Sequence, residues 1–228
     1  MKRRILIRNG ALAGLGLLSQ RCTPAAKVVT STPISPLTPP QTEGPFFPNQ
    51  EQNDLDADLT QVDSQEEKAT GEQVIVRVHL TDSNGNPIEE AMFDIWQACA
   101  SGRYNHSDDT SSAPLDPNFQ YWARLYTNHQ GFLQFKTIIP GSYPASSDWD
   151  RPPHIHFQIS IAAEEKLTSQ MYFDGHPLND IDRILNKTKV EYGEEAANNL
   201  IVDFSQRNED GIGVGDFHIV LGLTPATE

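Results

Sequence analysis

The stretch EQVIVRVHL at residues 72–80 decides the fold. Apolar side chains occupy every second position from Val74 to Leu80, and Arg77 and His79 stand between them. This alternation is typical of a β-strand with one face against a core and one face toward solvent. The fold is therefore expected to contain at least one sheet that is covered on one side.

The residues around this strand extend the β pattern. DSNGNP at 82–87 contains Asn-Gly, which is typical of a hairpin turn, and AMFDIWQA at 91–98 is the predicted returning strand. Further strands are predicted at 120–127, 132–139, 154–162, 167–173 and 216–222. Short strands separated by Gly/Pro turns predict an all-β fold, a two-sheet β-sandwich of prealbumin- or immunoglobulin-like topology. The single helical pattern, at 178–200, predicts one or two short helices late in the chain.

The first 26 residues, MKRRILIRNGALAGLGLLSQRCTPAA, differ from the rest. A basic start precedes an apolar run that is too short to span a bilayer, so residues 1–26 predict an export signal and a periplasmic or extracellular protein. KRRILIR resembles a twin-arginine signal, which exports proteins already folded around a cofactor; a Sec-type signal or a disordered tail is the alternative. Arg21 stands before Cys22 where lipoprotein signals have a small residue, which argues against lipid anchoring.

The remaining chain predicts a tether and one domain. Residues 27–41 are rich in Pro, Thr and Ser, which is typical of a linker, and residues 42–228 form the predicted domain. Cys99 is then alone, so no disulfide framework is expected. Six of the 17 basic residues precede Glu43, which leaves 11 against 31 acidic residues. This acidic balance argues against nucleic acid as a partner, and no membrane span is expected after processing.

RPPHIHF at 151–157 contains the strongest chemical pattern. Because side chains alternate along a strand, His154 and His156 point to the same face, together with Gln158 and Ser160. Two imidazoles on one face can bind a zinc, copper, iron or nickel ion. The pair alone is equally compatible with two histidines that are exposed or hydrogen-bonded.

Several motifs in a fixed order resemble the intradiol ring-cleavage dioxygenase family, in particular its protocatechuate 3,4-dioxygenases. The motifs are TEGPFFP (42–48), NPIEEAMFDIWQA (86–98), GRYNH (102–106), PLDPNF (114–119), GFLQFKTIIPGSYP (131–144), RPPHIHF (151–157) and LTSQMYFDG (167–175). The resemblance covers residues 42–175, and DFHIVL near the C-terminus is a weaker match. It implies an enzyme that cleaves a catechol-type aromatic with O₂ and non-haem Fe(III).

The resemblance also implies the site residues. The metal ligands would be Tyr104 of GRYNH, Tyr143 of PGSYP, His154 and His156. Arg151 would stabilise negative charge on the substrate, and Gln170 would lie beside it in the pocket. From the sequence alone, Arg151 could instead pair with Asp148 or Asp150, Gln170 could satisfy a strand end, and both tyrosines could be ordinary half-buried residues. His106 is at most a candidate for a contact behind the ligands.

The chemistry of these residue types supports the same assignment. Ferric iron prefers anionic oxygen ligands, and a bound metal can keep tyrosine deprotonated far below its usual pKa near 10. Two tyrosinates and a hydroxide would balance three positive charges. A catechol that displaces the hydroxide and Tyr143 would transfer its two protons to them, so Tyr143 is expected to be both ligand and catalytic base.

The chain also departs from the resembled enzymes. Ala145 follows SYP where protocatechuate enzymes have a tryptophan, the loop before the histidines is short, and no second subunit is indicated. A homo-oligomer is compatible with the sequence. The rival hypotheses are a non-catalytic β-sandwich module that binds zinc or carbohydrate, and a zinc or copper hydrolase with Asp148 or Asp150 as its base.

Overall fold

The computed structural model describes residues 35–49, 52, 54–63 and 65–222. The predicted export signal and residues 27–34 of the predicted tether lie outside the described residues. No helix among the residues described has both the length and the apolar character needed to cross a bilayer.

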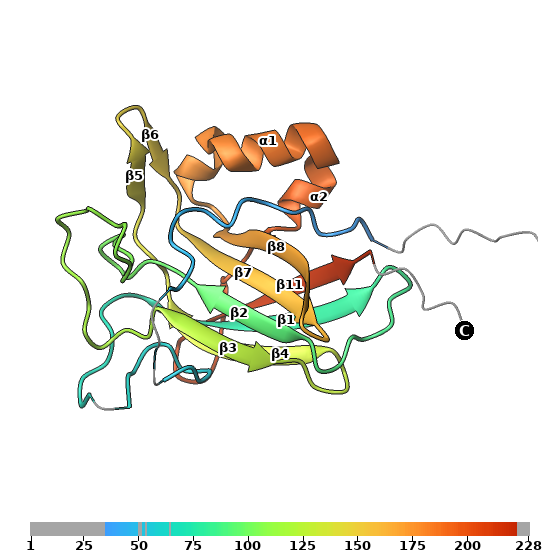
Figure 1. The fold of residues 1–228 in the computed structure, drawn as a ribbon, viewed down its shortest axis with the longest axis horizontal. Coiled ribbons are helices and arrows are strands. Elements are labelled where there is room, and N and C mark those ends of the chain that lie inside the picture. The colour runs from blue at the N-terminus through green and yellow to red at the C-terminus, as the bar shows by residue number, and fades with distance from the viewer. Residues whose placement is uncertain (1–34, 50–51, 53, 64, 223–228) are drawn as a thin grey trace, which may run out of the picture. The chain divides into compact units, whose positions relative to one another are not determined.

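The domain is a two-sheet β-sandwich, which confirms the predicted fold class (Figure 1). One sheet has the order β10-β11-β1-β4, and the other has the order β3-β2-β7-β8-β9. The strands of the first sheet are β1 (Gln73–Asp82), β4 (Phe132–Ile138), β10 (Gln206–Arg207) and β11 (Gly213–Leu221). Those of the second are β2 (Met92–Trp96), β3 (Trp122–Tyr126), β7 (His154–Ile161), β8 (Glu164–Phe173) and β9 (Ile201–Val202).

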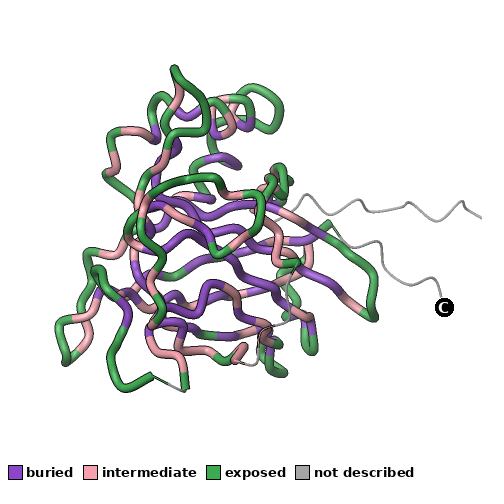
Figure 2. Tube along the Cα trace, turned by 60° about the vertical axis from the view of Figure 1, so that its left-hand side comes forward, coloured by how far each residue is buried: buried purple, intermediate pink, exposed green. Residues whose placement is uncertain are grey.

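The core lies between the two sheets, as the alternation in β1 predicts. Val74, Val76 and Val78 are fully buried there. From the facing sheet, Phe157 of β7 stacks on Phe93 at 5.3 Å between ring centroids and meets Phe217 of β11 edge-on at 5.4 Å. Figure 2 shows buried residues concentrated along the strands and exposed ones in the connecting loops. Phe157 therefore ties the histidine-bearing strand into the core.

The predicted hairpin after β1 is wrong. The turn itself forms: Gly85 N donates to Asp82 O at 3.0 Å, and Thr81 pairs with Pro87 in an isolated bridge. However, β1 pairs with β11 in parallel and with β4 in antiparallel orientation, while the chain after the turn crosses to the other sheet as β2. The Asn-Gly pair specifies a local reversal, but the strand partners come from distant parts of the chain.

A small layer covers the outer face of the second sheet at one end. It contains the 3-10 helix η1 (Pro177–Ile181), helices α1 (Arg183–Tyr192) and α2 (Glu194–Asn198), and a hairpin of β5 (Tyr143–Ser146) and β6 (Trp149–Arg151). In Figure 1 the helices lie above β8 and the hairpin stands beside α1. The two short helices confirm the helical prediction, whereas the hairpin replaces what the sequence predicted as a turn at PGSYP.

The segment before the first strand contacts both sheets and reaches this covered face. Thr38 N donates to Val220 O of β11 at 3.0 Å, and Gln41 N donates to Thr168 O of β8 at 2.9 Å. The Gln41 side chain reaches α1, where it donates to Thr188 Oγ1 at 2.9 Å. Strands, hairpin, helix and N-terminal segment thus meet on the outer face of β7 and β8, where the histidines lie.

Candidate metal centre

Strand β7 presents its two histidines on the face away from the core, as its alternation predicts. Ile155 and Phe157 point into the core. His154 and His156 are each only 2% exposed, because the covering layer excludes them from solvent. Their Nε2 atoms are 3.1 Å apart. The two rings therefore converge on one point instead of lying free on the surface.

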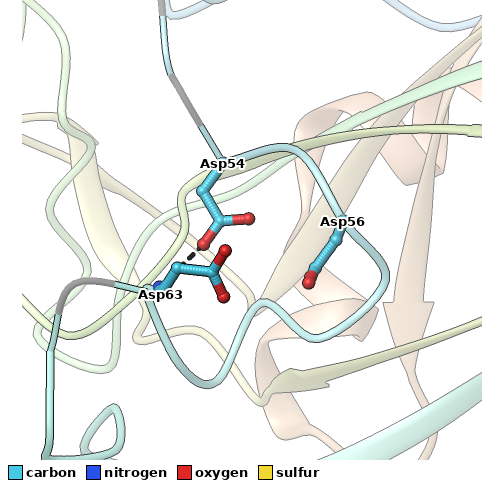
Figure 3. Close-up of side chains that lie close together, drawn as sticks. All are labelled: Asp54, Asp56 and Asp63. Carbon is cyan, nitrogen blue, oxygen red and sulfur yellow. Dashed lines mark hydrogen bonds between the residues drawn. The ribbon is translucent and has the colours of Figure 1, made fainter.

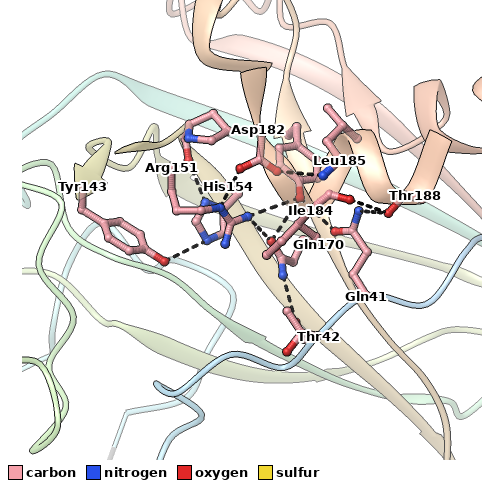
Figure 4. A network of polar contacts seen from close by, with 12 residues as sticks. Gln41, Thr42, Tyr143, Arg151, His154, Gln170, Asp182, Ile184, Leu185 and Thr188 are labelled. Atoms are coloured by element: carbon pink, nitrogen blue, oxygen red, sulfur yellow. Dashed lines mark hydrogen bonds and ion pairs between the residues drawn. The ribbon is translucent and has the colours of Figure 1, made fainter. Parts of the chain in front are cut away.

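Two tyrosines from separate loops reach the same point. Tyr104 lies in the loop after β2, and Tyr143 begins β5. Their hydroxyl oxygens lie 3.4 and 3.5 Å from His154 Nε2, and Figure 4 shows Tyr143 directed at the His154 ring. Donor atoms that each lie about 2 Å from a common ion are roughly 3 Å apart. The three distances from His154 Nε2 are compatible with four atoms around one ion.

A pair of glycines brings the two tyrosine loops together. Each tyrosine follows a Gly-x-Tyr pattern, Gly102 before Tyr104 and Gly141 before Tyr143. A Cβ atom on Gly102 would lie 2.4 Å from Ser142 O, and one on Gly141 would lie 2.5 Å from Gly102 N. The backbones can approach this closely only without side chains, so the repeated glycine is a signal that the sequence analysis missed.

Replacing Gly102 with alanine is expected to separate the tyrosine loops. The added methyl group would clash with the backbone at Ser142, and Gly102 also has a positive φ of 82°. We expect a loss of about 1–3 kcal/mol in the free energy of unfolding and weaker metal retention. Denaturant unfolding and metal analysis of the purified protein measure both quantities.

Gly211→Ala is the matched control for that substitution. Gly211 has a similar φ of 79°, but its added Cβ would meet no atom within 4 Å. It therefore carries the backbone strain without the clash. Equal effects of the two substitutions on metal retention would contradict the positioning role of Gly102.

The protonation of the histidines favours metal binding. His154 Nδ1 lies 2.7 Å from Pro152 O, to which it donates, so the Nε2 lone pair faces the centre. Burial, with Arg151 nearby, places the pKa of His154 well below its ordinary value and lowers that of His156 to about 3. Both imidazoles are neutral at pH 7, which is the ligating form.

His156 is buried among aromatic rings, and one of its two ring nitrogens has no hydrogen-bond partner among the described residues. This nitrogen is Nδ1, and the ring stacks on Trp96 at 5.0 Å between centroids. Tyr104 is 3% exposed and packs on Phe46 at 4.6 Å. Two neutral imidazoles and two buried phenols aimed at each other fit a hard, highly charged cation that can deprotonate the phenols.

Metal loading is expected to release protons from the tyrosines. Burial raises the pKa of Tyr143 and raises that of Tyr104 further above 10, so both phenols are protonated in the metal-free protein at pH 7. As ligands they are phenolates, so binding should release about one proton from each, and affinity should rise with pH. A pH-stat titration of metal-free protein with ferric iron measures the number of protons released per bound ion.

Tyr143→Phe should release about one proton fewer per bound ion than the wild type. Hydrolysis of aqueous iron contributes equally to both titrations and cancels in the difference. An unchanged number would mean that Tyr143 does not give up its proton to a metal.

Arg151 lies beside the histidines and Tyr143 in a buried polar network (Figure 4). Its Nε donates to Asp182 Oδ2 at 2.8 Å, and one terminal nitrogen donates to Gln170 Oε1 at 2.6 Å. Asp182 is fully buried and caps α1 by accepting from Leu185 N at 2.8 Å. Burial alone would lower the pKa of Arg151, but Tyr172 and Asp182 raise it above its ordinary value. Arg151 is therefore a fixed cation whose partner is Asp182.

This pairing excludes two alternatives left open by the sequence. Asp148 pairs with Arg183 at 2.7 Å on the surface and not with Arg151. Gln170 does more than satisfy a strand end, because its amide nitrogen donates to Thr42 O at 2.8 Å while its oxygen accepts from Arg151. Gln170 thus joins Arg151 to the N-terminal segment.

A cavity of about 660 Å³ opens beside these side chains. Tyr143, Arg151 and His156 form its inner end. Tyr104 lines a separate cavity of about 90 Å³, and Phe46 lines both cavities. A small molecule in the larger cavity would meet Tyr143 and not Tyr104, so the two tyrosines are not equivalent.

Other candidates lie away from this centre. His106 Nδ1 accepts from Asp108 N at 3.1 Å, so it supports a loop. Cys99 is buried and makes no disulfide with a described residue. Three carboxylates, Asp54, Asp56 and Asp63, gather in a surface loop (Figure 3), where Asp54 Oδ2 accepts from Asp63 N at 2.9 Å. These carboxylates brace their own loop, and we assign no ion to them.

Two residues of the site went unpredicted. Asp182 had no motif around it, and only its position at the start of the helical pattern could have indicated a buried cap. Trp96 is 1% exposed, and it packs against His156 in a cluster with Tyr104 and not in the main core.

Comparisons with known proteins show what the chain is similar to. Residues 42–222 match the model of a family described as "Dioxygenase". The chain is 38% identical over 189 residues to the protocatechuate 3,4-dioxygenase beta chain of Burkholderia cepacia, covering 80% of this chain and 78% of that one. It is 26% identical over 120 residues to a catechol 1,2-dioxygenase of Acinetobacter lwoffii, covering 47% of this chain and 42% of that one.

Solved structures share the fold. The dioxygenase domain of a carbohydrate-binding fusion protein from Streptomyces sp. SirexAA-E has a TM-score of 0.61 at 23% identity, over 82% of this chain and 99% of that one. An intradiol ring-cleavage dioxygenase from Tetranychus urticae has a TM-score of 0.59 at 24% identity, over 84% and 96%.

Proposed function

Because the chain belongs to the intradiol ring-cleavage dioxygenase family, we propose that it cleaves a catechol-type aromatic between the two hydroxylated carbons. Both atoms of O₂ enter the product, a cis,cis-muconate-type diacid, so the reaction needs no further oxidant or reductant. The observation that carries this proposal is the convergence of two phenol oxygens and two imidazole nitrogens, with distances of 3.1–3.5 Å from His154 Nε2 to the other three atoms.

The family generally uses non-haem ferric iron, and the donor set of this chain suits that ion. Tyr104, Tyr143, His154 and His156 are the proposed ligands. A ferric ion held there would bind the two catechol oxygens and make the ring reactive toward O₂. The buried surroundings of the ligands keep water from competing with the substrate.

Tyr143 is the proposed base of the reaction. It borders the large cavity, whereas Tyr104 borders only the small one. Burial raises the pKa of Tyr143, so its phenolate has a strong affinity for a proton once it is displaced. Tyr143 Oη would therefore accept the proton of an entering catechol hydroxyl, without a separate carboxylate base.

Arg151 is the proposed electrostatic stabiliser. It is 4% exposed, it borders the cavity, and Asp182 and Gln170 hold its guanidinium in one position. A fixed cation in a site that excludes water lowers the energy of negative charge that develops on the ring, because no reorganisation is needed. Gln170 acts through Arg151 and positions it.

The alternative is a module that binds zinc or carbohydrate without catalysis. Zinc would require neither buried phenol, and it would leave the protein colourless. The hydrolase hypothesis needs Asp148 or Asp150 as its base, but Arg183 holds Asp148 on the surface and Asp150 is exposed. The family match favours the oxygenase over both.

Turnover of simple catechols tests the proposed function. Iron-loaded protein is incubated with catechol, 4-methylcatechol, protocatechuate and hydroxyquinol while ring absorbance and dissolved O₂ are followed. We expect loss of the ring with one O₂ consumed per molecule of substrate for at least one of them. Protein with one iron per chain that consumes no O₂ with any of the four would support the non-catalytic module.

A further inference from the structure

The cavity beside the ligands is larger than a catechol ring requires. Its volume of about 660 Å³ lies within the range of roughly 300–1,000 Å³ that is usual for drug-sized ligands. A ring that reaches Tyr143 and His156 occupies only the inner end. The outer part is bordered by the loop 108–112 and by the β5–β6 hairpin. Space for a substituent is therefore part of the site.

The hairpin side of the outer cavity is open because its residues are small. Pro144 and Ala145 line it and are exposed, and Gly44 and Pro45 also line the cavity. Trp149 is the large residue of this wall, and the guanidinium groups of Arg151 and Arg183 lie over its ring at 5.4 and 5.3 Å from the centroid. The wall thus combines one fixed aromatic face with open space.

The loop side carries hydrogen-bonding groups. Thr110, Ser111 and Ser112 line the cavity and are exposed. The hydroxyls of Thr110 and Ser112 make no hydrogen bond to another described residue. Asp109 orders this loop, since it accepts from Ser111 N at 2.8 Å and from Tyr104 N at 2.7 Å. The backbone that carries these hydroxyls is therefore tied to the backbone of Tyr104 through Asp109.

The charge of the cavity is unfavourable to an anion. Arg151 is the single cation among its lining residues, and Asp182 already balances that charge. Asp108 and Asp109 add two carboxylates to the outer wall. Asp108 is exposed, and its nearest hydrogen-bond donor on a neighbouring side chain is the Ser107 hydroxyl at 3.5 Å. A second negative group placed there would be repelled by a carboxylate that no cation neutralises.

We propose that the outer part of this cavity is a subsite for a bulky, hydrogen-bonding substituent without negative charge on the catechol ring. Hydroxyl or amino groups of such a substituent bond to Thr110, Ser112 and Asp108, and an apolar portion packs on Trp149. The proposal rests on the proposed function, because the ring must reach Tyr143 and His156. It predicts that catechols with a carboxylate substituent bind more weakly than catechols with an uncharged one.

A pair of ligands matched in shape tests the charge preference. 3,4-Dihydroxybenzoate and 3,4-dihydroxybenzamide differ chiefly in one negative charge, and a catechol with a 4-(2-aminoethyl) group adds a positive one. We measure the dissociation constant of each by calorimetry without O₂, and kcat/KM with O₂. The amide and the amine are expected to have dissociation constants about tenfold or more below that of the benzoate, and kcat/KM values about tenfold or more above it.

Two variants locate the effect. Asp108→Lys is expected to lower the ratio of kcat/KM for the amide to kcat/KM for the benzoate by about tenfold or more. The reason is that it replaces the repelling carboxylate with a cation. Glu209→Lys is the matched control: it makes the same change in net charge on an exposed residue outside the cavity lining, and the ratio should stay as in the wild type. Equal responses of the two variants would show a general effect of net charge and overturn the subsite.

The outcomes separate the subsite from the proposed function. Turnover of catechol together with equal or stronger binding of the benzoate would overturn the subsite and leave the dioxygenase intact. Selective binding of the amide without turnover of any catechol would overturn the dioxygenase and leave a binding site of the proposed selectivity. Failure to distinguish amide from benzoate in either measurement overturns the inference.

Discussion

Replacing Tyr143 with phenylalanine is expected to lower kcat by roughly 10²–10⁴-fold, the range typical for loss of a positioned acid–base group. The substitution removes the phenol oxygen that lies 3.5 Å from His154 Nε2 and that borders the cavity. It thereby removes both a proposed ligand and the proposed acceptor of the catechol proton. Weaker iron retention and a shifted visible absorption should accompany the loss, because one of two phenolates is missing.

Tyr121→Phe is the control for Tyr143→Phe. Tyr121 is also a buried phenol, 8% exposed, and its hydroxyl accepts from Asp116 N at 2.8 Å, away from the histidines. Its loss should leave kcat and colour as in the wild type. If Tyr143→Phe kept the colour and kcat of the wild type, Tyr143 would be neither ligand nor base.

Replacing Asp182 with asparagine is expected to cost about 3–5 kcal/mol in the free energy of unfolding, because it leaves the buried charge of Arg151 without its partner. Asp182 is fully buried and Arg151 is 4% exposed, so water cannot compensate. Asparagine can still cap α1 through its oxygen, so the substitution tests the charge and not the cap. Denaturant unfolding measures the effect, and kcat should fall as Arg151 loses its fixed position.

Asp148→Asn is the matched control for Asp182→Asn. Arg183 and Asp148 form an ion pair of nearly the same length, 2.7 Å, and Arg183 stacks on the same Trp149 ring as Arg151. That pair is exposed to solvent, so its loss should leave stability within the experimental error. Similar losses in the free energy of unfolding of both variants would mean that the buried pair stabilises the protein no more than the exposed pair does.

The strands and the histidine face could be predicted from the sequence because they follow from local alternation. The period of two in β1 and β7 determines which side chains enter the core, and this places His154 and His156 together whatever the strand partners are. The resemblance supplied Tyr104 and Tyr143, which periodicity cannot place because both lie outside the main sheets.

What could not be predicted depends on contacts between distant segments. The Asn84–Gly85 turn forms, yet β2 joins the other sheet, because turn chemistry does not determine which strands pair. The partner of Arg151 was sought at Asp148 and Asp150, close in sequence, but it is Asp182, 31 residues later at the start of α1. Carboxylates close to Arg151 in sequence lie on the surface. A buried arginine needs a partner that the fold excludes from water, and such a partner can come from a distant part of the chain.

The visible absorption spectrum of the iron-loaded protein, together with its iron content, tests the central claim most directly. Two phenolates bound to ferric iron absorb visible light by charge transfer, so the account predicts one iron per chain and a wine-red colour that weakens or shifts in Tyr143→Phe. A protein that binds one ferric ion per chain and stays colourless would contradict the claim that Tyr104 and Tyr143 join His154 and His156 around a single metal.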